Sequence, residues 1–264
     1  MQNHNIIKIK DVVVQWIRDW FQNNGKGCNA VVGISGGKDS SVVAALCVEA
    51  LGADRVIGVL MPNLKQDDID FSYRLVEHLR IKYYLVPVSM PIADTLNQIR
   101  RSGITASQQA IINLPARIRM ATLYAISQSL NGRVANTSNY SEDYIGWATR
   151  YGDGAGDFCP IARLTSTEVV ALGKALGLPD ELVNKPPSDG LTGKTDEDNF
   201  GFSYEVLDRY IMDGECADVD VMRKIYAMHT KNAFKLHMPP CCEVWKILSQ
   251  SECDTFVLGR KERK

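Results

Sequence analysis

The chain has 264 residues, enough to bury the core of one large domain, and its 45% hydrophobic and 23% charged content is ordinary for a globular protein. Its formal net charge of -1 gives no overall positive field for nucleic acid, and no apolar run is long enough to span a membrane. Its seven cysteines form no C-x-x-C pair and residues 1–11 show no secretion signal, so we expect reduced thiols and a cytoplasmic location.

Helix and strand patterns alternate along the first half of the chain. An amphipathic helix is predicted over Ile6–Phe21, where apolar residues recur at helical spacing. The predicted strands are Ala30–Ile34, Val56–Met61, Tyr83–Val88 and Arg133–Thr137, and the helices between them are Ser41–Leu51, Gln66–Arg80 and Ile112–Leu130. This order indicates an α/β fold, a doubly wound parallel sheet with helices on both faces, and we expect residues 1–264 to form a single domain.

The second half of the chain has a less regular pattern. Residues Tyr140–Cys159 are rich in Gly, Asp and aromatic residues without a clear period, which is typical of a long functional loop. A helix is predicted over Thr165–Leu176, opened by a capping box of Thr165 and Glu168. The Pro/Gly/Asp-rich segment Asn184–Asp198 is expected to be mobile. Two further helices are predicted, Phe202–Tyr210 and Val219–Met228.

A serine- and glycine-rich segment, Ser35–Ser41, links the first predicted strand to its helix. Its glycines predict a tight turn that presents backbone N–H groups at a helix N-terminus, a site for phosphate. Asp39, Ser40 and Ser41 are expected to cap that helix. A carboxylate beside bound phosphates would repel them without a cation, so Asp39 predicts a Mg2+ site. The alternative is a plain glycine-rich turn that binds nothing.

The spacing of this segment excludes two commoner phosphate-binding motifs. The P-loop needs Ser or Thr after its Gly-Lys pair, whereas Asp39 stands there, and the glycines miss the G-x-G-x-x-G spacing of dinucleotide-binding folds. Residues Ser35–Ser40 instead resemble the Ser-Gly-Gly-x-Asp-Ser signature of the N-type ATP pyrophosphatases. In that family the loop grips the pyrophosphate end of ATP, and the enzyme transfers AMP to an acceptor.

A second polar stretch, Asn136–Glu142, follows the fourth predicted strand. Ligands bind parallel sheets at the carboxyl ends of strands where the strand order reverses, so we expect this stretch to face the first loop. Thr137 is predicted to contact the nucleotide, and Glu142 to share one Mg2+ ion with Asp39. Taken alone, Glu142 would also fit an exposed or capping glutamate.

Two arginines stand two residues apart on the long predicted helix, so they point in different directions. We expect Arg117 to bind a phosphate or carboxylate, and the alternative is that it forms a surface ion pair. For Arg119 we expect the surface ion pair. The loop Trp147–Asp157 combines acids, an arginine, aromatic rings and glycines. This mixture suits a polar ligand that carries a ring, although a surface turn would also explain it.

Taken in order from Ser35 to Pro239, these motifs are similar to those of the ammonia-dependent NAD+ synthetases. The family motif Asn-x-x-Ala-Arg-x-Arg-Met is matched by Asn113, Ala116, Arg117, Arg119 and Met120. The motif Gly-Thr-x-x-x-x-Glu is matched by Thr137–Glu142, and the motif Thr-Lys-Tyr-Gly-Asp-Gly-x-x-Asp is matched by Thr149–Asp157. Further along they are Lys185–Leu191 to Lys-x-Pro-Thr/Ser-x-x-Leu, then Asp196-Glu197 and Phe202-x-Tyr204-Glu205. The resemblance implies a Rossmann-like fold of the adenine nucleotide alpha hydrolase type.

The resemblance also implies a set of site residues. ATP would be bound by Gly33, Ile34, Ser35, Gly36, Gly37, Lys38, Asp39, Ser40, Thr137, Ser166 and Ser188. The deamidated dinucleotide would be bound by Arg117, Arg150, Asp157, Phe234 and Lys235. Asp39 and Glu142 would hold Mg2+, and Asp39 would thereby take part in catalysis.

Four residues depart from the family pattern. Asn136 replaces a glycine, and Arg150 replaces a lysine, which keeps the charge but changes its geometry. Ser166 aligns with an ATP-contacting lysine, so a positive charge is missing there, and Phe234 replaces the histidine of a His-Lys pair. We interpret these last two as marks of a divergent branch.

The implied reaction has two steps. The nicotinate carboxylate of deamido-NAD+ attacks the α-phosphorus of ATP and releases pyrophosphate, and ammonia then converts the acyl-adenylate to NAD+ and AMP. Because ammonia is mostly ammonium at neutral pH, we predict that Asp153 captures and deprotonates it. The chain has no room for an amidase domain, so free ammonia or a separate subunit would supply nitrogen. The resemblance also implies a homodimer. The apolar residues of the helix Ile112–Leu130 would fit burial in the dimer interface or, equally, burial in the core of the chain itself.

Two other functions fit the same loop. A tRNA-modifying enzyme would adenylate a base before sulfur or amine transfer, but it would usually carry a basic face or a zinc domain. A non-catalytic nucleotide sensor would explain Ser166 and Phe234 as marks of lost turnover. Release of AMP and pyrophosphate that depends on both deamido-NAD+ and ammonia would separate the synthetase from these alternatives.

Overall fold

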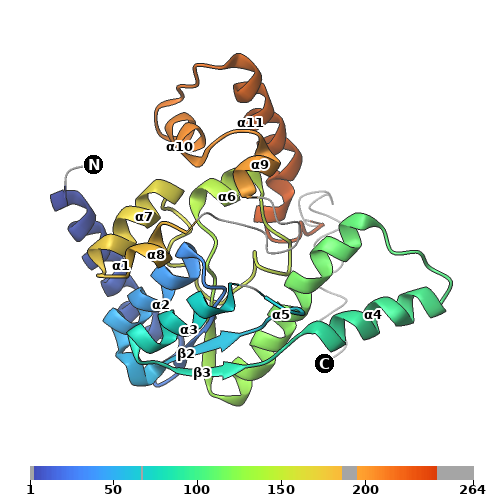
Figure 1. Ribbon diagram of the computed structural model, residues 1–264. Coiled ribbons are helices and arrows are strands. Elements are labelled where there is room, and N and C mark those ends of the chain that lie inside the picture. Colours follow the sequence, from blue (N-terminus) through green and yellow to red (C-terminus); the bar gives the residue numbers. More distant parts are fainter. Residues whose placement is uncertain (1–2, 67, 186–194, 243–264) are drawn as a thin grey trace, which may run out of the picture.

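A four-stranded parallel sheet forms the centre of the protein, as seen in a computed structural model that describes residues 3–66, 68–185 and 195–242 (Figure 1). The strands are β1 (Asn29–Gly33), β2 (Val56–Leu60), β3 (Lys82–Leu85) and β4 (Gly132–Ala135), in the order β3-β2-β1-β4. β1 pairs in parallel with both β2 and β4. From β1 the chain adds β2 and then β3 on one side. It then returns to add β4 on the other side of β1, so the strand order reverses between β1 and β4.

Helices surround this sheet. They are α1 (Asn3–Asn24), α2 (Lys38–Leu51), α3 (Ile69–Leu79), α4 (Ser89–Arg101), α5 (Gln108–Ser129), α6 (Tyr140–Ile145), α7 (Ser166–Ala175), α8 (Asp180–Val183), α9 (Asp196–Phe200), α10 (Tyr204–Asp213) and α11 (Val219–Asn232), with short 3-10 turns η1 (Ala53–Arg55) and η2 (Ala233–Leu236). No helix in the described ranges combines the length and the apolar character needed to cross a membrane.

The side chains of β1 alternate between two apolar layers, as the pleat of a strand requires. Ala30 and Val32 are fully buried in the larger cluster, which also contains buried residues of α1, α2, α3 and α7. Val31 points to the opposite face, where it joins Leu123 of α5 and Val134 of β4. Helices thus cover both faces of the parallel sheet, which confirms the expected doubly wound architecture.

A smaller apolar cluster lies beyond the sheet, among α6, α9, α10 and α11 (Figure 1). Its buried members include Ile145, Phe200, Leu207 and Ile225. Tyr204 of α10 belongs to the same cluster. This packing holds α9 and α10 against α6, the helix that follows β4, and so brings distant parts of the chain to the carboxyl end of the sheet.

The predicted strands and long helices are confirmed within a few residues of their bounds, and four helices were not expected. One of the four, α9, begins at Asp196, inside the segment that was expected to be mobile. α4 was not predicted. Ile92 is its one buried residue, and Pro91 is tolerated because it lies in the first turn. α6 lies inside the stretch expected to be irregular, and the four-residue α8 follows Pro179. Residues 186–194 of the segment expected to be mobile lie outside the described residues.

Candidate active site

The turn after β1 is shaped by its glycines and serines. Gly36 has φ +76°, and a Cβ there would lie 3.0 Å from both Cβ of Phe71 and the backbone nitrogen of Ser72, so only glycine fits. The Ser35 hydroxyl accepts a hydrogen bond from the Gly37 N–H at 3.2 Å and lies 3.0 Å from the Ser40 hydroxyl. These contacts fix the shape of the turn.

Helix α2 begins three residues earlier than expected, at Lys38. Its N-cap is Gly37, which provides no side-chain cap, so the predicted capping by Asp39, Ser40 and Ser41 is wrong. The hydroxyls of Ser40 and Ser41 instead donate to the Gly37 carbonyl oxygen, at 3.1 and 2.7 Å. A helix N-terminus without a side-chain cap leaves its N–H groups available to an anion.

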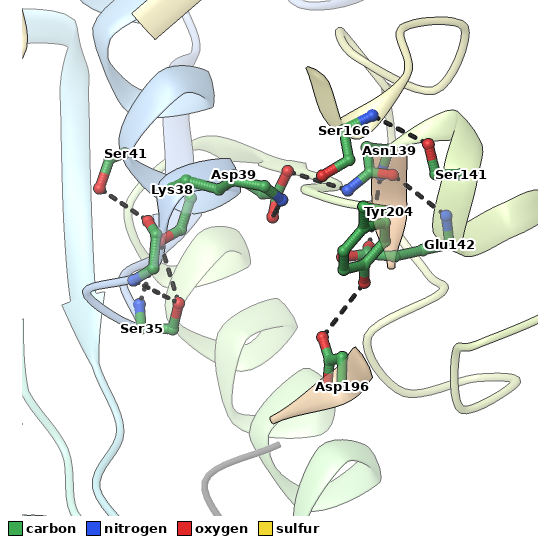
Figure 2. Close-up of polar contacts among 12 residues, drawn as sticks. Ser35, Lys38, Asp39, Ser41, Asn139, Ser141, Glu142, Ser166, Asp196 and Tyr204 are labelled. Carbon is green, nitrogen blue, oxygen red and sulfur yellow. Dashed lines mark hydrogen bonds and ion pairs between the residues drawn. The ribbon is translucent and has the colours of Figure 1, made fainter. Parts of the chain in front are cut away.

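The polar ends of β1 and β4 meet at the reversal of strand order (Figure 2). The amide nitrogen Nδ2 of Asn139 donates to Oδ1 of Asp39 at 3.0 Å, across 100 residues of sequence. Asn139 also caps α6, because its Oδ1 accepts the Glu142 N–H at 3.1 Å in a capping box. One buried asparagine therefore fixes both Asp39 and the helix that carries Glu142.

Lys38 is buried beside these carboxylates, with 4% of its side chain exposed. Its ammonium lies 2.7 Å from Oδ2 of Asp39 and 5.4 Å from the ring centre of Tyr204. Burial lowers the pKa of Lys38, but the carboxylates of Asp39 and Glu142 outweigh that effect and the net pKa is raised. The lysine therefore carries its charge at neutral pH.

The carboxylates of Asp39 and Glu142 suit a divalent cation. Loss of water and the nearby charge of Asp39 raise the pKa of Glu142 well above its ordinary value, although the ammonium of Lys38 opposes that effect, so further positive charge at this place would favour the ionised pair. Hard oxygen donors of this kind match Mg2+. No group of three or more His, Cys, Asp or Glu residues is arranged to hold a metal within the described ranges, so phosphate and water would complete the coordination.

Asp196 and Tyr204 lie at the same site, where no local sequence pattern had predicted them. The buried Asp196 carboxylate accepts a hydrogen bond from the Tyr204 hydroxyl at 3.2 Å (Figure 2). It accepts a second one from Nε1 of Trp147, also at 3.2 Å. Burial and the surrounding carboxylates raise the pKa of the Tyr204 hydroxyl, which keeps it protonated as a donor. Both residues fall in motifs that resemble those of the NAD+ synthetases, and this resemblance is the sequence signal that could have identified them as site residues.

Ser166 lies at the first turn of α7, opened by the confirmed capping box of Thr165 and Glu168. Its N–H donates to the Ser141 hydroxyl at 2.9 Å, and that hydroxyl donates to the buried carboxylate of Asp208. Ser166 is thus joined to the helix that carries Glu142. Thr137, also predicted to contact ATP, is half-buried just beyond β4, and Ser188 lies outside the described residues.

Asn136 anchors the loop that carries Asp153. Its Nδ2 donates to the carbonyl oxygens of Asp153 and Ala155, at 2.9 and 3.1 Å. The departure from glycine at position 136 thus has a structural role. Within this loop, Oδ1 of Asp153 accepts the Thr149 N–H at 2.7 Å. Although the residue is exposed overall, loss of water around its carboxyl group raises the pKa of Asp153.

The two arginines of α5 differ from expectation. Arg119 is half-buried and its Nε donates to the carbonyl oxygen of Met61 at 3.0 Å, just beyond β2, so the prediction of a surface ion pair is wrong. Burial lowers the pKa of Arg119, and the charge of Asp153 opposes that effect. Arg117 is exposed, and its Nε donates to the carbonyl oxygen of Arg150 at 3.3 Å.

Three of the predicted dinucleotide contacts gather near η2. The Arg150 guanidinium lies 5.6 Å from the ring centre of Phe234, and Nζ of Lys235 donates to the carbonyl oxygen of Gly146 at 2.8 Å. Asp157 is placed differently. Its carboxylate accepts the Val134 N–H at 2.7 Å and the hydroxyl of Tyr124 at 3.3 Å, so it caps the free edge of β4.

A parallel sheet whose reversal point carries a Ser-Gly-Gly-x-Asp-Ser turn and paired carboxylates defines an enzyme of the ATP pyrophosphatase class. The family model described as NAD synthase matches residues 9–239, and the chain belongs to that family. The NH(3)-dependent NAD(+) synthetase of Methanocaldococcus jannaschii is 37% identical over 257 residues, which cover 90% of this chain and 97% of the relative. The family expected from the sequence is confirmed.

Two solved structures share this fold over nearly their whole length. NMN synthetase from Francisella tularensis superposes with a TM-score of 0.83 at 30% identity, covering 90% of this chain and 98% of the other. The NH3-dependent NAD synthetase from Campylobacter jejuni gives a TM-score of 0.74 at 30% identity, covering 92% of this chain and all of the other. These likenesses favour a synthetase over the tRNA-modifying and sensor alternatives.

Proposed function

We propose that this chain makes NAD+ by amidating deamido-NAD+ with ammonia, while ATP is cleaved to AMP and pyrophosphate. The observation that carries the proposal is the hydrogen bond from Asn139 to Asp39, because it joins the phosphate-binding turn to the helix of Glu142. That junction lies where a parallel sheet binds its ligand. The curated relatives are named for this reaction.

The turn from Ser35 to Ser40 binds the pyrophosphate end of ATP. Negative charge grows on this leaving group as the α-phosphorus is attacked, and donors already fixed in place stabilise the transition state more than the ground state. The N–H groups at the start of α2 and the side chain of Lys38 supply those donors. Gly33, Ile34, Thr137, Ser166 and Ser188 complete the predicted contacts with ATP.

Asp39 and Glu142 would hold the Mg2+ ion that accompanies ATP. The ion would supply positive charge to neutralise the phosphates beside these two carboxylates. Asn139 keeps Asp39 oriented through its amide, and Lys38 pairs with the other oxygen of the same carboxylate.

The deamidated dinucleotide binds near the loop of Asp153. Arg117, Arg150 and Lys235 supply cations to its phosphates and carboxylate, and Phe234 lies against Arg150. Asp157 is the remaining proposed contact, although its carboxylate is engaged by β4 in this structure. The nicotinate carboxylate is held close to the α-phosphorus, and this positioning supplies much of the rate.

Asp153 prepares ammonia for the second step. Its carboxylate accepts a proton from ammonium and leaves neutral ammonia to attack the acyl-adenylate carbon, after which AMP departs. The raised pKa of Asp153 brings this group closer to neutrality, the range in which a general base works best. Burial lowers the pKa of Arg119 and of Lys235, and the charge of Asp153 opposes that effect at both, so these two cations interact with the proposed base.

A homodimer completes the proposal, with the α4–α5 arm as its interface. This arm reaches beyond the edge of the sheet (Figure 1) and exposes large apolar side chains. Met90 is 71% exposed, Ile104 60% and Ile111 42%. Apolar residues gathered on one projecting arm mark an interaction surface, and a second copy of the chain is the partner we propose. We also place the enzyme in the cytoplasm, in keeping with the free thiols of six cysteines in the described ranges.

A mononucleotide is the second candidate acceptor. It is favoured by the likeness to the NMN synthetase of Francisella tularensis, with its TM-score of 0.83. Nicotinate mononucleotide would present the same carboxylate to the α-phosphorus, so the two candidates share their chemistry. The ratio of kcat/KM for the two acceptors, measured at one ATP and ammonium concentration, decides between them.

The proposed function is tested by product release. Purified protein should release AMP and pyrophosphate only when ATP, deamido-NAD+ and ammonium are all present, and NAD+ should form in equal amount. Glutamine should not replace ammonium. ATP binding without acceptor-dependent turnover would leave a nucleotide sensor as the better description.

A further inference from the structure

Lys38 occupies an unfavourable place for a lysine. It is the first residue of α2, where the helix dipole disfavours a cation, and its side chain is 4% exposed. Burial of an unpaired ammonium costs several kcal/mol. Strong compensation must therefore come from its surroundings.

Carboxylates provide that compensation (Figure 2). The ammonium of Lys38 lies 2.7 Å from Oδ2 of Asp39, and it faces the ring of Tyr204 at 5.4 Å. The hydroxyl of that tyrosine donates to Asp196, and the charges of Glu142 and Asp196 also act on Lys38. Asp39 thus pairs directly with the buried ammonium of Lys38, and the charges of Glu142 and Asp196 add to that stabilisation.

We infer that Lys38 is the resident counter-ion of Asp39 and Glu142 in the ligand-free enzyme, and that it transfers from Asp39 to the phosphates when ATP arrives with its divalent cation. This inference rests on the proposed function. A divalent cation alone must displace the ammonium from Asp39, which leaves a buried lysine without its ion-pair partner. A cation that arrives with ATP also brings phosphate oxygens, which give the displaced ammonium a new partner.

The chemistry of lysine suits this exchange. Its ammonium is a compact point charge with three donors on a flexible stem, so it changes partner without the fixed fork geometry of arginine. The N–H groups of the preformed turn lie at the same helix end and attract the same phosphates. Metal binding and nucleotide binding should therefore be coupled through one side chain.

The test measures binding of Mn2+ alone, by calorimetry or electron paramagnetic resonance, without any nucleotide. Lys38→Met keeps the length and apolar stem but removes the charge, so Mn2+ no longer competes with an ammonium for Asp39 and should bind about tenfold more tightly than in the wild type. Lys10→Met is the matched control, because Lys10 is another partly buried lysine and pairs with Glu49 at 3.5 Å, away from the turn. That variant should bind Mn2+ as the wild type does.

A second measurement follows the anion. With Mg2+ present, Lys38→Met should bind pyrophosphate about tenfold more weakly than the wild type. In the wild-type protein, adding pyrophosphate should tighten Mn2+ binding by at least about tenfold, and this measurement needs no variant to fold. Equal Mn2+ affinity of wild type and Lys38→Met, or no effect of pyrophosphate on the wild type, would overturn the inference. NAD+ synthesis by the wild type in that case would leave the proposed function standing.

Discussion

The guanidinium of Arg150 lies over the ring of Phe234, with 5.6 Å between its central carbon and the ring centre. It also lies 5.1 Å from the ring centre of Tyr151, and Nη2 donates to the carbonyl oxygen of His237 at 3.0 Å. Arg150 and Phe234 are two of the four departures from the family pattern, and they contact each other. Since a guanidinium stacks well on an aromatic face, the two departures form a matched pair.

This pairing predicts coupled effects of mutation. Arg150→Lys and Phe234→His should each raise the KM for deamido-NAD+, because each removes one half of the stack. The double variant, which restores the family residues at both positions, should lose less than the sum of the two single losses. A double-mutant cycle on KM measures this coupling, which we expect to be about 1 kcal/mol.

Additive losses would contradict the matched pair. Phe234→Leu is a useful control, because it keeps an apolar side chain without an aromatic face. It should resemble Phe234→His in raising KM while kcat changes little.

Asn139 has two separable roles, and Asn139→Ser separates them. Serine keeps an oxygen that can cap α6 but lacks the amide that reaches Asp39. We expect unfolding stability close to that of the wild type and a KM for ATP raised by about tenfold. Asn139→Ala should show the same defect in ATP use and lose about 1 kcal/mol of stability with the cap. An unchanged KM for ATP in both variants would contradict the positioning role.

Asp153→Asn should slow the amidation step more than adenylation. The amide can still accept the Thr149 N–H, so the loop should keep its shape. We expect ATP–pyrophosphate exchange with deamido-NAD+ to remain near the wild-type rate while ammonia-dependent NAD+ formation falls by about 100-fold. Equal loss of both reactions, or loss of neither, would contradict the assignment of Asp153 as the base.

The raised pKa of Asp153 also predicts a pH dependence. The base acts when ionised, so wild-type amidation should rise with pH through a pKa above the ordinary value for aspartate, and Asp153→Asn should lack this rise. The contribution of Asp153 to the free energy of unfolding changes with pH in the opposite direction. A carboxyl with a raised pKa in the folded state favours folding while protonated, so its contribution is lost as pH rises through that pKa. Unfolding curves of the two proteins across acidic pH measure the difference.

Asp208 should be a major stabilising residue away from the reaction. Its buried carboxylate accepts from the hydroxyl of Ser141 and from the N–H of Thr167, and so joins α6, α7 and α10. Asp208→Ala leaves these donors buried without a partner and should reduce the free energy of unfolding by about 3 kcal/mol. Asp213→Ala, at the exposed end of the same helix, should change it by less than about 0.5 kcal/mol. Urea unfolding of the three proteins tests both values.

A charge on the α4–α5 arm should separate the proposed dimer. Ile111→Asp places a carboxylate on a residue that is 42% exposed, so the monomer should fold normally while association is lost. Light scattering after size exclusion should then report the mass of one chain instead of two. Asp94→Asn, on α4, keeps the apolar residues and should leave the mass unchanged. A wild-type protein that elutes as a monomer at micromolar concentration would contradict the interface.

The sequence by itself determined those features that depend on neighbouring residues. The apolar run before Ser35, the glycines of the turn and the helix after it predict a phosphate site from local spacing alone. The alternation of strand and helix patterns likewise indicated the doubly wound sheet, since parallel strands require crossovers. The capping box of Thr165 and Glu168 was recognisable because its two members stand three residues apart.

The tertiary structure alone decided which distant side chains meet. Asn139 and Asp39 are separated by 100 residues, and their hydrogen bond exists because β4 crosses back to lie beside β1. Arg119 faces the sheet and Arg117 faces solvent because of how α5 packs, and their spacing left that choice open. Asp196 reaches the site because the small cluster holds α9 over it. Contacts across a fold depend on crossovers and packing, which no local pattern encodes.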